Sequence, residues 1–445
     1  MRLSLAEVLE ATGGGVRGGT ELADSFLSFH TDSRQVRPGG LFFALKGAQT
    51  DGHAFIGDAA QRGAAGVVVC EDAQVSGGVA EVVVGDTWRA LYDLAGFALR
   101  RTQPLVVGVT GSNGKTTTKE MMAAVLGLRH RVLKTEGNLN TETGVPLTLL
   151  ALEPGHTALV LEMALQGPGE IARLAELARP EVGIVTTVGS VHLEFFKSRR
   201  ALARAKGELV ERLPADGRAV LNAEGEFFRL LSGLSRAPVT SFGLERGDLR
   251  GEGYRSLPEG GCAFSVRGVE VRLRLAGRHQ ARNALAALAA GEHAGVELPA
   301  GAGALAEVAV EHRLQELETP AGFRVVDDSY NASPESMLAA FEVLAERPRP
   351  ARLLAVLGEM RELGGVAESA HREVGQAARR LFDQVCVVDA GWGKQLAKAA
   401  GAELVSDREA AEAWVRRHAG PGSVVLVKAS HGLRLDLLVQ RLLGR

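Results

Sequence analysis

The chain has 445 residues, 46% of them hydrophobic and 23% charged, which excludes a disordered or fibrous protein and predicts two or three folded domains. The formal net charge of -2 lacks the basic surplus of a nucleic-acid-binding protein, so we expect no nucleic-acid partner. The longest apolar runs match single buried strands and are too short to cross a membrane, so we expect no membrane insertion.

The cysteines and the first residues of the chain point to the same compartment. Cys70, Cys262 and Cys386 are widely separated and form no Cys-x-x-Cys pair, which disfavours a disulfide scaffold and a zinc site. Residues 1–16 contain acidic residues and glycines where a secretory signal needs an unbroken apolar core. We therefore expect a cytoplasmic protein.

Residues 1–100 predict a small α/β domain with a helix that leads out of it. Strand-like runs at 41–45, 66–70 and 81–85 alternate with helix-like segments. Residues 88–101 then predict a connecting helix, and Pro104 separates this helix from the next predicted strand.

Residues 101–311 predict a second α/β domain with a mainly parallel sheet, because strands and helices alternate along it. A small antiparallel addition is expected in 240–276, where Val-Arg-Leu-Arg-Leu at 271–275 alternates between apolar and charged residues. The other predicted strands are 105–109, 156–163 and 182–188. One predicted helix starts at residue 115, and the others cover 170–178, 199–212 and 283–294.

A third α/β domain is predicted for residues 312–445. A Gly/Ala/Pro stretch at 295–305 indicates the approach to its boundary. Predicted strands at 323–326, 352–357, 384–388 and 423–427 are separated by segments long enough for helices.

A strand, a glycine loop and a helix are predicted in succession around residues 108–119, Gly-Val-Thr-Gly-Ser-Asn-Gly-Lys-Thr-Thr-Thr-Lys. Backbone N–H groups at a helix start suit a polyphosphate, Lys115 supplies a positive charge, and Thr116 supplies a hydroxyl for Mg²⁺. The strict form of the motif has glycine where this chain has Val109, so the match is a variant. We predict ATP binding by Gly111, Ser112, Asn113, Gly114, Lys115, Thr116 and Thr117.

Three classes of protein use such a loop: molecular switches, small-molecule kinases, and ligases that activate a carboxylate. A guanine-nucleotide switch is disfavoured because no Asn in this sequence is followed by Lys, as its base-reading motif requires. The loop alone leaves kinase and ligase open, since both position the γ-phosphate for attack.

Three downstream residues are candidates for the same site. Glu162 ends an apolar strand, where open α/β sheets place ligand-binding groups, and it is a candidate Mg²⁺ ligand. His192 follows the next predicted strand and can reach the same edge. Lys206 lies on a predicted helix. Each residue alone has an ordinary alternative interpretation as a solvated side chain.

Together with the loop, these residues resemble the Mur ligase family, the ATP-dependent amide-bond ligases of peptidoglycan precursor assembly. The similarity also covers Gly-Asn-Leu-Asn-Thr at 137–141, Ala-Lys-Gly-Glu at 205–208 and the segment 277–287. It implies three domains: an N-terminal one for the UDP substrate, a central ATPase domain, and a Rossmann-like C-terminal domain that contacts ATP and the second substrate.

The resemblance also implies roles for individual residues. Lys115, Glu162, His192 and Lys206 would be catalytic, and Thr116, Glu162, His192 and a carbamylated Lys206 would hold Mg²⁺. His279, Asn283, Arg313 and Asp328 would lie near ATP. The substrates would contact Ser33, Arg34, Lys46, Asn138, Asn140, Thr141 and Asn331.

One segment indicates the reaction within the family. Asp-Asp-Ser-Tyr-Asn-Ala-Ser-Pro at 327–334, with 356–364, resembles members that ligate D-alanyl-D-alanine to UDP-N-acetylmuramoyl-tripeptide through an acyl phosphate. Lys-Ala-Ser-His at 428–431 departs from the more usual Lys-Gly-Ser-Arg. The alternatives are a ligase that adds a single amino acid, a folylpolyglutamate synthase, and an assembly protein without turnover. We expect a monomer.

Overall fold

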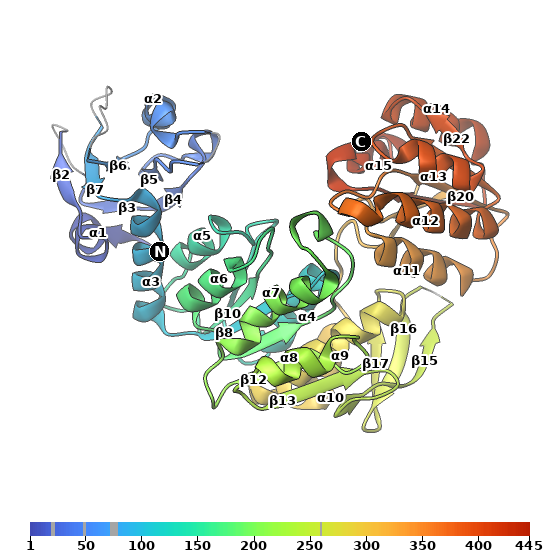
Figure 1. The fold of residues 1–445 in the computed structure, drawn as a ribbon, viewed down its shortest axis with the longest axis horizontal. Helices are drawn as coiled ribbons and strands as arrows, with labels where there is room; N and C mark the ends of the chain where they lie inside the picture. The colour runs from blue at the N-terminus through green and yellow to red at the C-terminus, as the bar shows by residue number, and fades with distance from the viewer. Residues whose placement is uncertain (19–22, 48–49, 72–78, 259) are drawn as a thin grey trace.

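The computed structural model describes residues 1–18, 23–47, 50–71, 79–258 and 260–445. Its elements form three successive groups along the chain (Figure 1). The blue N-terminal group and the orange-to-red C-terminal group lie at opposite sides of this view, and the green-to-yellow central group joins them.

The N-terminal group contains a five-stranded sheet in the order β2-β7-β6-β5-β4. Strands β4 to β7 are parallel neighbours, and β2 pairs antiparallel with β7. The sequence therefore predicted the α/β character of this part and its three main strands. The elements are β1 (Leu3–Ser4), α1 (Leu5–Thr12), β2 (Gly15–Arg17), β3 (Ser25–Phe26), β4 (Ser28–His30), β5 (Gly40–Phe43), α2 (Ile56–Gln61), β6 (Gly66–Cys70) and β7 (Glu81–Val84).

Helix α3 (Thr87–Thr102) connects this sheet to the central group, as predicted. Its first turn is capped by Asp86, whose Oδ1 accepts hydrogen bonds from the N–H groups of Trp88 at 2.8 Å and Arg89 at 3.1 Å. The helix ends at Gln103, which has a left-handed φ of 46° and precedes Pro104.

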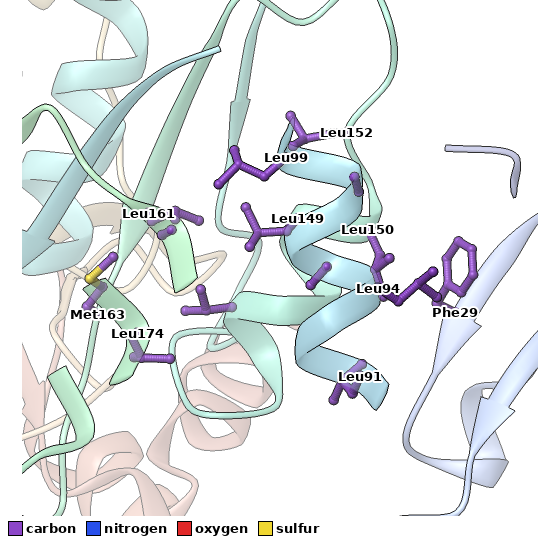
Figure 2. Close-up of a cluster of buried hydrophobic side chains, with 14 of the residues drawn as sticks. Phe29, Leu91, Leu94, Leu99, Leu149, Leu150, Leu152, Leu161, Met163 and Leu174 are labelled. Carbon is purple, nitrogen blue, oxygen red and sulfur yellow. The ribbon is translucent and has the colours of Figure 1, made fainter. Parts of the chain in front are cut away.

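One buried hydrophobic cluster is shared by the N-terminal and central groups. Figure 2 shows Leu91, Leu94 and Leu99 of α3 among residues of both groups, with Phe29 of β4 on one side. Leu149 and Leu150, from helix α5 (Gly144–Leu150), belong to the same cluster. Since apolar burial is the main favourable contribution to folding, this shared cluster fixes the first two groups to each other.

The central group is built on a seven-stranded sheet, β14-β13-β12-β11-β8-β10-β9, in which all neighbouring strands are parallel. Along β10, Leu159 and Leu161 face one apolar cluster and Val160 faces the other, so helices cover both faces. The strands are β8 (Leu105–Thr110), β9 (Val132–Lys134), β10 (Ala158–Glu162), β11 (Val182–Val185), β12 (Arg218–Asn222), β13 (Val239–Gly243) and β14 (Leu249–Arg250). The helices are α4 (Lys115–Leu126), α5, α6 (Glu170–Ala178), α7 (Arg199–Glu211), α8 (Phe228–Leu234), α9 (Arg278–His293) and α10 (Leu298–Leu305).

The expected antiparallel addition is confirmed. Strands β15 (Glu252–Ser256), β16 (Cys262–Val266) and β17 (Val269–Leu273) form a separate antiparallel sheet. Its buried positions alternate along β17, where Val271 and Leu273 face the core and Glu270 and Arg272 are exposed.

One helix of this group was not predicted, and one strand was predicted too long. The Gly/Ala/Pro stretch at 295–305 contains helix α10, because Pro299 suits a first helical turn and Gly301 allows close packing on Leu288. Strand β11 ends at Val185 and does not reach residue 188. Residues 186–188 form a loop instead, and the Thr187 carbonyl accepts a hydrogen bond from the Ser112 N–H at 2.8 Å.

The C-terminal group has a six-stranded sheet, β18-β19-β23-β20-β21-β22, parallel except for β18 at its edge. Two apolar clusters cover its two faces. The predicted strands are present, and β18 and β22 are additional. The elements are β18 (Gln315–Glu318), β19 (Arg324–Asp327), α11 (Pro334–Ala345), β20 (Arg352–Leu357), α12 (Ala367–Leu381), β21 (Gln384–Val388), α13 (Gly393–Ala400), β22 (Glu403–Val405), α14 (Arg408–His418), β23 (Ser423–Lys428) and α15 (Leu435–Leu442).

None of the helices within the described residues combines the length and the apolar character that a transmembrane segment needs.

Candidate active site

The glycine loop connects the end of β8 to the start of α4, as predicted. Gly111 and Gly114 have φ values of 152° and 84°, and a side chain at either position would collide with Thr186 or Asn283, respectively. Both positions therefore require glycine. No side chain caps α4, so the N–H groups of its first turn remain available to an anion.

Lys115 is the first residue of α4, and its ammonium group folds back over the loop. Nζ donates a hydrogen bond to the Gly111 carbonyl at 2.8 Å. Burial lowers the pKa of Lys115, and the Glu162 carboxylate opposes this shift. A partly desolvated cation at this position will strongly favour a phosphate group.

Glu162 is the last residue of β10 and is buried. Asn140 Nδ2 donates a hydrogen bond to Glu162 Oε1 at 2.8 Å, and the backbone N–H of Glu162 donates to Thr135 Oγ1 at 3.0 Å. The second carboxylate oxygen, Oε2, is buried and has no hydrogen-bond partner among the described residues. The interpretation of Glu162 as a solvated carboxylate is therefore wrong, and the free oxygen can accept a cation.

His192 lies at the end of the loop that follows β11, and it contacts a residue of the C-terminal group. Its Nδ1 lies 2.5 Å from Glu362 Oε2, within ion-pair distance. The His192 contact lowers the pKa of the Glu362 carboxyl group. This pair joins two groups of the fold at one wall of the cleft.

Lys206 lies on α7 and is only 1% exposed, so the interpretation as a solvated lysine is wrong. Burial lowers its pKa well below the usual range, and the charge of Lys115 lowers it further. Within the described parts of the chain, no carboxylate forms an ion pair with Lys206, and Lys206 does not line the cleft wall. An amine in this environment favours its neutral form.

A cleft of about 890 Å³ brings together residues from all three groups of the fold. Trp88 of α3 lines the cleft on its N-terminal side, and Tyr330, Glu362 and His431 line it on its C-terminal side. The predicted site residues that line it are Ser112, Asn113, Gly114, Lys115, Thr116, Asn138, Asn140, Thr141, Glu162, His192, Arg313 and Asn331.

A second cavity of about 230 Å³ shares Asn113, Gly114 and Thr116 with the main cleft and is lined by the central and C-terminal groups. Its lining includes Thr117, His279, Asn283, Arg313 and Asp328, all of which were predicted to lie near ATP. Burial lowers the pKa of His279 to about 4, and the cationic charge of Lys428 adds to the shift. The ring is therefore neutral at pH 7 and can accept or donate a hydrogen bond.

Asp328 and Lys428 form a buried ion pair at this cavity, with 2.6 Å between Oδ2 and Nζ. Burial raises the pKa of Asp328 and lowers that of Lys428, and the attraction between the two charges opposes both shifts. Lys428 Nζ also donates to the Asn331 carbonyl at 3.0 Å, which links the second cavity to the main cleft.

The structure does not bring the three predicted UDP-contacting residues into the main cleft. Ser33 is buried in the N-terminal group, and Arg34 forms an exposed ion pair with Asp32 at 2.7 Å. Lys46 is exposed, and its carbonyl accepts a hydrogen bond from Trp88 Nε1 at 3.0 Å. Because Trp88 lines the cleft, this hydrogen bond links the Lys46 backbone to the cleft wall.

Sequence reasoning missed several residues of this region, including Tyr330, Glu335, Glu362 and His431. The Arg313 guanidinium lies 4.3 Å from the centre of the Tyr330 ring, and the Ser190 N–H donates to Glu335 Oε1 at 2.8 Å. All four residues lie in or beside segments that the resemblance covers, but nothing in their spacing indicates which side chains face the cleft.

The comparisons with known proteins agree with this architecture. The Mur ligase family, catalytic domain, matches residues 28–125; the Mur ligase middle domain matches 109–291; and the Mur ligase, glutamate ligase domain, matches 312–431. The UDP-N-acetylmuramoyl-tripeptide–D-alanyl-D-alanine ligase of Synechocystis sp. is 37% identical over 93% of this chain and 91% of its own length.

Solved structures show the same three-domain α/β fold. MurF from Acinetobacter baumannii aligns with a TM-score of 0.90 and 28% identity, covering 100% of this chain and 99% of that one. MurF ligase from Thermotoga maritima, solved in complex with ADP, aligns with a TM-score of 0.83 and 32% identity over 94% of this chain and 97% of that one. The cleft, the glycine loop and these matches together establish that the chain belongs to the Mur ligase family.

Proposed function

We propose that this chain is an ATP-dependent, ADP-forming ligase that joins D-alanyl-D-alanine to UDP-N-acetylmuramoyl-tripeptide in the synthesis of a peptidoglycan precursor. The observation that carries the proposal is the cleft in which Lys115, Glu162 and Asn331 meet. It places a phosphate loop opposite the C-terminal segment 327–334. The alternative is a family member that adds a single amino acid.

The first step activates the tripeptide. Its terminal carboxylate attacks the γ-phosphorus of ATP, the bond to the β-phosphate oxygen breaks, and ADP leaves an acyl phosphate behind. Two anions must approach each other in this step. Lys115 and the free N–H groups of α4 lower that repulsion by holding the phosphate oxygens.

The second step forms the amide. The amine of D-alanyl-D-alanine attacks the acyl carbon, phosphate leaves, and one proton of the amine is lost. Water must be kept away from the mixed anhydride until this happens. The C-terminal group closes the cleft through Ser333 and Glu335, which contact Asn113 and Ser190 of the central group.

Mg²⁺ belongs to this proposal, and the residues present fit it. The free buried oxygen of Glu162, the hydroxyl of Thr116 and the ring of His192 all face the cleft region and would hold the ion. No cluster of three or more His, Cys, Asp or Glu side chains occurs in the described residues, which suits an ion that takes other ligands from phosphates and water. Bound Mg²⁺ would supply charge neutralisation for the phosphate groups.

Lys206 would be a carbamate in the working enzyme. A buried amine with a lowered pKa is largely neutral, and only a neutral amine adds CO₂. The resulting anion would compensate the charges of Lys115 and the metal.

Three further assignments complete the proposal. The domains are 1–100 for the UDP moiety, 101–311 for ATP, and 312–445 for ATP and the dipeptide. Ser33, Arg34 and Lys46 would contact the UDP moiety, and Asn138, Asn140, Thr141 and Asn331 the peptide parts. The described cysteines are free thiols, which is consistent with a cytoplasmic protein, and a monomer remains our prediction.

The choice of amine tests the proposal. ADP release is measured with UDP-N-acetylmuramoyl-tripeptide while D-alanyl-D-alanine, D-alanine or a diamino acid is supplied separately. We expect ADP release above background only with the dipeptide. Release only with a single amino acid would support the alternative and contradict the dipeptide assignment.

A further inference from the structure

The contact between Glu362 and His192 joins the C-terminal group to the central group at the wall of the main cleft. Glu362 follows β20 in the C-terminal group, and His192 follows β11 in the central group. Besides the 2.5 Å approach of Oε2 to Nδ1, the Glu194 N–H donates a hydrogen bond to the Glu362 carbonyl at 3.3 Å. The loop of Glu362 therefore docks on the loop of His192 through both side chain and backbone.

The backbone of Glu362 is held in an unfavourable conformation. Its φ is 62°, in the left-handed region that disfavours residues with a side chain. The neighbouring residues keep it there: the Met360 N–H donates to His371 Nε2 at 2.9 Å, and the Arg361 N–H donates to Ser430 Oγ at 2.9 Å. Strain that the surroundings maintain at a cleft indicates a functional constraint.

Glu362 is also the one acidic side chain that the C-terminal group contributes to the main cleft in the described residues. The other cleft carboxylates, Glu142, Glu162 and Glu170, belong to the central group. A carboxylate that contacts one ring nitrogen of a histidine fixes the ring and leaves its other nitrogen for a metal.

We propose that Glu362 is a positioning residue that orients His192 across the domain interface and thereby couples metal binding to docking of the C-terminal domain. The inference rests on the proposed Mg²⁺ site of His192 and Glu162. Because the metal binds better when Glu362 is docked, the metal in turn stabilises the docked arrangement by the same factor. The Mg²⁺ site is then complete only when the cleft is closed.

Metal affinity gives a direct test. Mn²⁺ is titrated into the full chain in the presence of ADP, and free Mn²⁺ is followed by electron paramagnetic resonance. We expect Glu362→Gln to weaken Mn²⁺ binding by about 10-fold or more, the range seen when such supporting carboxylates are lost. Glu194→Gln removes the same charge from an exposed neighbouring side chain and should bind Mn²⁺ as the unmodified chain does.

Coupling to docking requires a second readout. Small-angle scattering should show the chain becoming more compact as Mn²⁺ and ADP are added, and Glu362→Gln should need about 10-fold more Mn²⁺ for the same change. The Mg²⁺ concentration for half-maximal turnover of this variant should rise by the same factor.

A glycine variant separates this role from a structural one. Glu362→Gly relieves the left-handed backbone, so its melting temperature should not fall, whereas its Mn²⁺ affinity should fall as in Glu362→Gln. Unchanged Mn²⁺ affinity in both variants would overturn the inference and leave the proposed ligase activity intact. If the unmodified chain bound no Mn²⁺ with ADP, the proposed metal site itself would be wrong, and the inference would fail with it.

Discussion

The hydroxyl group of Ser333 donates a hydrogen bond to Oδ1 of Asn113 at 3.2 Å. Ser333 is the N-cap of α11, where its Oγ also accepts a hydrogen bond from the Ser336 N–H at 3.2 Å. The first C-terminal helix therefore begins directly against the phosphate loop. One side chain contributes both to the stability of α11 and to the closed arrangement around the nucleotide.

Ser333→Ala should lower both the stability and the apparent ATP affinity. Loss of the cap should cost about 1 kcal/mol of unfolding free energy. Loss of the contact with Asn113 should raise the KM for ATP severalfold, because the C-terminal domain then docks less firmly on the loop. Thermal unfolding and steady-state kinetics measure the two effects.

Asp407→Ala is the matched control for this variant. Asp407 caps α14 by accepting a hydrogen bond from the Ala410 N–H at 2.8 Å, and it lines neither cavity of the site. It should lose a similar amount of stability and keep the KM for ATP. An equal rise of KM in both variants would attribute the Ser333 effect to stability alone.

Glu162→Gln should weaken the response to Mg²⁺ without destabilising the fold. Glutamine keeps an oxygen for the hydrogen bond from Asn140 but removes the negative charge whose second oxygen has no partner. The Mg²⁺ concentration for half-maximal activity should rise about 10-fold or more, and the melting temperature should not fall. Glu136→Gln is the control, because Glu136 is exposed and lies a few residues before Asn140. An unchanged Mg²⁺ response in Glu162→Gln would show that Glu162 is not part of the metal site.

Lys206→Ala should reduce turnover by about 100-fold or more, because the proposed carbamate would be lost with the amine. Acetate or formate added to the assay should restore part of the activity by supplying a carboxylate in its place. Arg204→Ala, at an exposed position of the same helix, should retain normal turnover. Normal turnover of Lys206→Ala would show that Lys206 has no part in the reaction.

The lowered pKa of His279 should make the stability of the fold depend on pH. The folded chain holds the pKa of His279 at about 4, whereas an unfolded histidine titrates near 6.5. Between about pH 6.5 and about pH 4 the unfolded chain binds a proton that the folded chain does not. The contribution of neutral His279 to the stability of the fold is therefore complete above about pH 6.5 and is lost as the pH falls toward about 4. His279→Asn should therefore show a smaller drop in melting temperature between about pH 7 and about pH 5. The same drop in both proteins would contradict the assignment.

Local signals predicted much of the fold. The valine-rich strands, the capped helix α3 and the glycine loop all depend on neighbouring residues, so the sequence indicated them directly. Helix α10 was missed because its Gly/Ala/Pro composition is typical of a linker, and only packing on Leu288 favours the helix. Strand β11 was predicted too long because Thr187 is β-branched, as strand residues often are, but its carbonyl bonds to the phosphate loop instead.

The site could be predicted only in part for a related reason. Lys115 and Glu162 stand at a helix start and a strand end, positions that the sequence pattern locates. The burial of Lys206 and the approach of Glu362 to His192 depend on how separate elements pack, and no spacing in the sequence encodes that. The approach of Glu362 also requires the left-handed backbone at that residue, which propensity argues against.

The mass of the product distinguishes ligation of the dipeptide from addition of a single amino acid. Purified chain is incubated with ATP, Mg²⁺, UDP-N-acetylmuramoyl-tripeptide and D-alanyl-D-alanine, and the UDP-linked products are analysed by mass spectrometry. We predict a UDP-N-acetylmuramoyl-pentapeptide formed in a one-to-one ratio with ADP. ATP hydrolysis without this pentapeptide, or a product extended by a single residue, would contradict it.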